Sequence, residues 1–155
     1  MAFSVWCRAF KNGETIPTRF TGDGDDASPA ITWGDAPPGT RGFALICDDP
    51  DAPMGTWTHW LIYDIPGDSA GLKEGIPPMD VVEGGAKQGL NSWPRIGYGG
   101  PSPPPGKPHR YFFKLYALKD MLGLPPGVDK RTLLRAMEGR VLGQAEFHGT
   151  YGRKR

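Results

Sequence analysis

Three carboxylates lie among prolines in the stretch CDDPDAPMGTWTHW, residues 47–60, and a histidine follows them. Asp49 and His59 are the pair with the clearest chemistry, because a carboxylate that accepts from an imidazole fixes its tautomer and favours the protonated ring. Asp49 is therefore expected to face a ligand or to orient His59. Asp51 is expected to cap the turn through its own backbone, and Asp48 to point to solvent.

A second histidine and a tyrosine follow another loop rich in glycine and proline. The loop GYGGPSPPPGKP, residues 97–108, leads directly into His109 and Tyr111. Two imidazoles, a phenol hydroxyl and glycine N–H groups supply several hydrogen-bond donors, which suits a phosphate or carboxylate ligand. His148 has no companion motif, and we interpret it as a surface or packing residue.

The segments that carry these residues predict strands that bring them together. Residues 42–49 and 59–65 are apolar runs with nine residues between them, too few for a helical crossover, so they should pair in antiparallel fashion. Asp49 would then lie near His59, at the same end of the sheet. Residues 109–119 predict a third strand, which His109 and Tyr111 open on one face.

The remaining segments also favour β structure. One helix is expected within residues 128–139, with Asp129 as its N-cap and Gly139 as its stop. Strands and helices do not alternate, which argues against a doubly wound parallel sheet and predicts a mostly β fold with few short helices. The further strands are expected at residues 2–10, 30–33 and 141–151, with one or two weak strands in 81–93.

The composition indicates one domain over residues 1–155. The 23 glycines and 17 prolines among 155 residues cluster between apolar segments and indicate long shaped loops, and residues 152–155 look like a flexible tail. The net charge of +1 argues against a nucleic-acid partner, and no apolar run is long enough to span a membrane. The two cysteines make no disulfide framework and the first residues show no signal peptide, so a cytoplasmic location is expected.

Four motifs, in order and with fitting gaps, resemble the phosphatidylethanolamine-binding protein family, and its prokaryotic, Raf-kinase-inhibitor-like branch in particular. They are DPDAP (49–53), HW (59–60), GYGGP with PPPGKPHRY (97–111) and QAEFHGTYGR (144–153). The resemblance implies an antiparallel-rich β-sheet sandwich with an anion pocket at one end of the sheet, and a cis bond before Pro53. Ser92 after Asn91 departs from the acidic residue usual in related prokaryotic sequences. The pocket residues implied are Asp49, His59, Gly99, Gly100, Pro101, His109 and Tyr111, with Trp57 or Trp93 as a rim.

The function expected is a regulatory module that binds a small anion or a phosphate headgroup, neither an enzyme nor dependent on a cofactor. The alternative implied by the resemblance is an inhibitor that contacts a kinase or a serine protease as its protein partner. A homodimer is compatible with the sequence, which assigns no surface to it.

Two enzymatic alternatives use residues already present. Asp49, His59 and His109 have the composition of a two-histidine, one-carboxylate iron site, although the sequence contains no His-x-Asp or His-x-Glu motif. GDSAG, residues 67–71, fits the serine hydrolase pattern, but the following LKEGIPP does not provide the helix that a nucleophile elbow requires.

Overall fold

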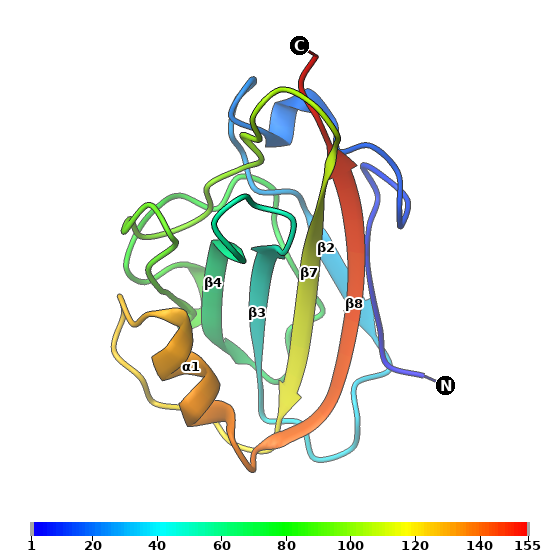
Figure 1. The fold of residues 1–155 in the computed structure, drawn as a ribbon. Helices are drawn as coiled ribbons and strands as arrows, with labels where there is room; N and C mark the ends of the chain where they lie inside the picture. Colours follow the sequence, from blue (N-terminus) through cyan, green and yellow to red (C-terminus); the bar gives the residue numbers. More distant parts are fainter. Residues whose placement is uncertain (1, 155) are drawn as a thin grey trace.

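The computed structural model describes residues 2–154 and contains two antiparallel sheets and one α-helix (Figure 1). The smaller sheet has the order β1-β2-β5, and the larger has the order β6-β4-β3-β7-β8. The strands are β1 (Ser4–Cys7), β2 (Ile31–Gly34), β3 (Gly42–Asp49), β4 (Trp57–Pro66), β5 (Gly71–Leu72), β6 (Lys87–Gln88), β7 (His109–Leu118) and β8 (Val141–Tyr151). The helices are α1 (Lys130–Met137) and the short 3₁₀ turns η1 (Thr18–Phe20) and η2 (Glu83–Gly85). The mostly β prediction is confirmed.

β3 is the central strand of the larger sheet, and all eight of its residues are buried. Alternation sends Phe43 and Leu45 into the core between the two sheets. Ala44 and Ile46 point to the opposite face, where they pack against Leu133 of α1. Both faces of β3 are therefore covered, which explains its continuous apolar run.

The helix begins and ends where its caps predict. Asp129 accepts a hydrogen bond from the Thr132 N–H at 2.9 Å, and Gly139 has a φ of 74° that suits a residue without a Cβ. Figure 1 shows α1 beside β4, over one face of the larger sheet.

Several expected strands are shorter than the sequence suggested. The strand expected at 2–10 is limited to β1, and the segment 81–93 contributes η2 and the two residues of β6. β5 was not expected at all. These segments pair over two to four residues, and short pairings leave only a weak pattern in sequence.

The ends of three strands define one end of the larger sheet. β3 ends at Asp49, β4 begins at Trp57 and β7 begins at His109, and the pairs β3–β4 and β3–β7 are both antiparallel as expected. The end of β3 and the starts of β4 and β7 lie together at the upper end of the sheet in Figure 1, and the carboxylate and both histidines therefore belong to the same end of the sheet.

Candidate functional site

Asp49 at the end of β3 is buried and accepts two hydrogen bonds. His109 Nδ1 donates to Asp49 Oδ2 at 2.7 Å, and the Asp51 N–H donates to Asp49 Oδ1 at 2.8 Å. The expected pairing of Asp49 with His59 is wrong, because β7 borders β3 on its other side and places His109 within reach of the same carboxylate. The bond to Asp49 fixes Nδ1 of His109 as the donor and leaves Nε2 available.

His59 is held by a neutral partner. Its Nδ1 lies 2.6 Å from the Gly99 carbonyl oxygen, and the Gly99 N–H donates back to the His59 carbonyl at 2.9 Å. Since a carbonyl only accepts, Nδ1 carries the proton and Nε2 is free of bonds within residues 2–154. Burial lowers the pKa of His59, so the ring is neutral at pH 7.

Tyr111 packs between the two imidazoles. Its ring meets His59 edge-on at 5.1 Å between centroids and stacks on His109 at 6.5 Å. Burial, with Asp49 adding a negative charge nearby, raises the pKa of Tyr111 well above its usual value. The hydroxyl therefore stays protonated and remains a hydrogen-bond donor.

These side chains line a cavity of about 260 Å³. Two prolines from the 101–108 loop and Pro53 with Met54 from the 50–55 loop form its rim, and Met54 is 95% exposed. The expectation that Trp57 or Trp93 forms part of the pocket agrees with this lining. The lining comprises Asp49, Ala52, Pro53, Met54, Trp57, His59, Trp93, Ser102, Pro103, Pro104, His109 and Tyr111.

Gly99, Gly100 and Pro101 lie behind this cavity and support it. Besides the Gly99 bonds to His59, the Gly100 N–H donates to Asp26 Oδ1 at 2.7 Å. Gly99 and Gly100 line a separate, more polar hollow beyond the Trp93 ring. The wall of the histidine cavity on this side is instead formed by Ser102, Pro103 and Pro104. The run of prolines in the sequence was a signal for this wall, but the motif GYGGP was given more weight.

The other two aspartates do not behave as expected. Asp48 is 2% exposed, because it points to the α1 face, where Lys130 Nζ lies 2.7 Å from its Oδ2 and the Thr58 hydroxyl also donates to it. Asp51 does not cap its turn, since Asp49 accepts that bond. Asp51 instead accepts three hydrogen bonds of 2.9 Å from Arg110, two from the guanidinium and one from the backbone N–H.

The bond before Pro53 is trans, and no cis peptide bond occurs in residues 2–154, so the expected cis bond is wrong. The turn closes by other means. Asp49 accepts from the Asp51 N–H, the Gly55 N–H donates to the Ala52 carbonyl at 3.1 Å, and Gly55 adopts a φ of 109°.

One donor in the cavity wall lacks an acceptor. Trp57 Nε1 is the one buried side-chain nitrogen or oxygen without a hydrogen-bond partner in the part of the chain that the structure describes. Trp57 lines the cavity, but its Nε1 is itself buried, so this N–H is an unmade hydrogen bond that costs free energy.

The structure also places the residues of the iron-site and serine hydrolase alternatives. Across residues 2–154, no three His, Cys, Asp or Glu side chains are arranged so that they could hold a metal ion together. Ser69 lies in the turn between β4 and β5, where its hydroxyl donates to the Gly71 carbonyl at 3.0 Å. No helix in this part of the chain has the length and apolar character needed to cross a membrane.

The fold and the cavity together define a β-sheet ligand-binding domain. A family model described as phosphatidylethanolamine-binding protein matches residues 6–152. The chain belongs to this family.

Relatives and solved structures agree with the assignment. The chain is 52% identical to a UPF0098 protein of Aquifex aeolicus, and the match covers 96% of this chain and 88% of the relative. It is 50% identical to a UPF0098 protein of Methanothermobacter thermautotrophicus, where the match covers 94% of this chain and 95% of the relative. The crystal structure of Escherichia coli YbcL, described as a new member of the mammalian PEBP family, superposes with a TM-score of 0.92 at 32% identity, covering 99% and 100% of the two chains. A putative PEBP homologue from Chlamydia trachomatis gives 0.90 at 36% identity, covering 99% of each.

Proposed function

We propose that the protein binds a small anion, such as a phosphate-bearing headgroup, in the cavity of Asp49, His59, His109 and Tyr111. The observation that carries the proposal is the pair of imidazoles whose Nδ1 atoms are both occupied, by Asp49 and by the Gly99 carbonyl, while neither Nε2 has a partner in residues 2–154. Both rings are held in fixed orientations with the same nitrogen left for a ligand.

The protonation state of the rings decides what they offer. A neutral ring that donates through Nδ1 presents Nε2 as an acceptor, whereas a protonated ring presents Nε2–H as a charged donor. An anion stabilises the protonated form, so anion binding takes up a proton and strengthens as pH falls through the histidine range. Asp49 compensates the charge on His109 from behind, and the Tyr111 hydroxyl adds a neutral donor.

The dimensions favour a headgroup over a whole lipid. A cavity of about 260 Å³ is slightly below the size range of sites for drug-sized ligands. The apolar rim of prolines and Met54 would contact whatever chain is attached to the anion. The loops on both sides are stiffened by proline, which lowers the ordering cost of binding.

The test is a histidine-resolved NMR titration of chelator-treated protein with sulfate and with phosphate, at pH 6 and pH 7.5. Sulfate keeps its charge over this range, so its pH dependence reports on the protein, whereas phosphate also titrates. We expect His59 and His109 to shift together and saturably, with tighter sulfate binding at pH 6, while His148 stays still. Absence of a saturable shift in both rings, or a shift only after metal is added, would contradict the proposal.

A regulatory role and a cytoplasmic location extend this proposal, and stoichiometric inhibition of a kinase or protease remains its alternative. Mixing the protein with a candidate kinase or protease distinguishes an inhibitor from a binding module, since an inhibitor lowers the enzyme's activity at equimolar amounts.

A further inference from the structure

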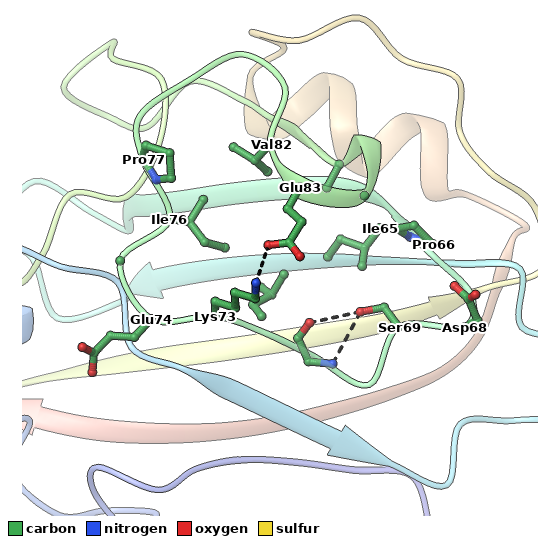
Figure 2. Close-up of a pocket in the computed structure, with 15 residues that line it drawn as sticks. Ile65, Pro66, Asp68, Ser69, Lys73, Glu74, Ile76, Pro77, Val82 and Glu83 are labelled. Carbon is green, nitrogen blue, oxygen red and sulfur yellow. Dashed lines mark hydrogen bonds and ion pairs between the residues drawn. The ribbon is translucent and has the colours of Figure 1, made fainter.

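A second cavity, of about 380 Å³, lies at the other end of β4 from the histidine cavity. The end of β4, the strand β5 and the 73–86 segment enclose it (Figure 2). His59 and Ile65 are six residues apart on β4, so the two cavities are separated by about 20 Å of strand. A ligand of headgroup size cannot occupy both.

The walls of this second cavity are apolar. Ile65 and Ala86 form a fully buried floor, each 1% exposed, and Leu72, Ile76 and Val82 are half-buried around it. These half-buried side chains leave apolar surface in contact with water, and covering it with an apolar ligand is favourable in proportion to the area.

Hydrogen bonds to β2 and to the segment that precedes it hold the walls in place. Trp33 Nε1–H donates to the Ser69 carbonyl at 2.9 Å, the Gly75 N–H donates to the Ser28 carbonyl at 2.9 Å, and the Ile76 N–H donates to Ser28 Oγ at 3.0 Å. The cavity is therefore preformed, and binding does not require the loop to order first.

The mouth carries an excess of negative charge. Lys73 Nζ lies 3.0 Å from Glu83 Oε2, and these side chains are 78% and 73% exposed. Glu74 pairs with Arg19 and points away from them (Figure 2). Asp68, beside Pro66 at the edge of the cavity, has no ion-pair partner within residues 2–154.

We infer that this cavity is a second ligand site, for a small molecule with an apolar body and an ammonium group. The body packs against Ile65, Leu72 and Val82, and the ammonium lies at the mouth near Asp68 and Glu83. The Lys73–Glu83 pair is an exposed surface pair, which contributes little to stability, so a ligand ammonium can displace Lys73 from Glu83.

The test compares an amine with its neutral counterpart, 2-phenylethylamine with 2-phenylethanol, by NMR titration of the full chain at low salt. Both compounds should shift the signals of Leu72, Ile76 and Val82 saturably, and the amine should bind more tightly. Asp68→Asn should weaken amine binding about two- to fivefold, as expected for an exposed charge pair, and leave the alcohol unchanged. Lys73→Met should strengthen amine binding, because it removes both a repelling charge and a competitor for Glu83.

Two further variants separate the cavity from its charges. Val82→Phe fills the mouth and should reduce the affinity of both compounds at least tenfold, and Asp120→Asn, an exposed aspartate that does not line this cavity, should change neither. If Val82→Phe does not fold, Ile76→Phe takes its place. Equal affinity for amine and alcohol in the unsubstituted chain overturns the inference, as do shifts centred on His59 and His109 or no saturable shift at all.

Discussion

His59 and His109 differ in the partner that holds Nδ1, and this difference sets their roles. A carbonyl holds the buried His59, whereas a carboxylate holds His109 and can compensate a positive charge on the ring. His109 is thus the ring better placed to meet an anion in its charged form. We predict that His109→Ala weakens sulfate binding about tenfold at pH 6, the size expected for loss of one charge-assisted hydrogen bond. Calorimetric titration with sulfate measures this change in affinity.

The matched control for this substitution is His148→Ala. His148 lies on β8, stacked on Phe112 at 4.9 Å between ring centroids, and does not line the cavity. Its removal should leave sulfate affinity unchanged. If His109→Ala retains full affinity while its amide spectrum shows a folded protein, His109 is not at the centre of the anion site.

Among the elements, the 50–55 loop is attached to β7 by the Asp51–Arg110 pair. Arg110 lowers the pKa of Asp51 from its ordinary value near 4 to about 2. A lowered pKa stabilises the fold at pH values above the ordinary pKa of the carboxyl group. This stabilisation is lost as the pH falls through about 2. Asp51 is 29% exposed, so Asp51→Asn should cost about 1 kcal/mol at pH 7 rather than the full value that the shift implies.

Urea unfolding of the unsubstituted chain and of Asp51→Asn at pH 7, 5, 4 and 3 measures this effect. The difference in the free energy of unfolding between the two proteins should be constant from pH 7 to about pH 5 and should narrow between pH 4 and pH 3. A difference that stays constant down to pH 3 would mean that the substitution acts through something other than the charge of Asp51.

The helix α1 should contribute stability without affecting the cavity. Leu133 is fully buried against the face of the larger sheet opposite the sandwich core. Leu133→Ala should lower the free energy of unfolding by about 3 kcal/mol, as is typical of large-to-small substitutions in a core. Sulfate affinity should stay within twofold of the unsubstituted chain, and a larger loss would indicate that α1 also positions the binding residues.

The sequence predicted well those features that a single helix or strand determines by itself. The caps of α1, the apolar run of β3 and the alternation along β7 are local patterns with a direct structural meaning. What it missed depended on neighbours in space. The partner of Asp49 was decided by which strand lies on the far side of β3, and the burial of Asp48 by a lysine that comes 82 residues later.

At the scale of the whole molecule, the segment after β8 and the loop after η1 meet beside the loop that lines the anion cavity. Arg153, in the segment expected to be a flexible tail, forms two hydrogen bonds to Asp23 in the loop after η1 and donates to the Pro103 carbonyl at 3.1 Å. The Gly106 N–H donates to the Arg153 carbonyl at 3.0 Å. The 101–108 loop, whose Pro103 and Pro104 line the cavity, is therefore held by the last strand and its extension.

We therefore predict that Arg153→Ala weakens sulfate binding about two- to fivefold, because Pro103 loses a donor that holds the cavity wall and the loop must order on binding. Its matched control is Lys154→Ala, which removes the same charge one residue later from a side chain that does not contact Asp23 or Pro103. The loss should appear in the rate of sulfate release rather than in the pH profile, since neither imidazole is touched. Equal effects of the two substitutions would mean that overall charge, and not the attachment of the loop, controls the affinity.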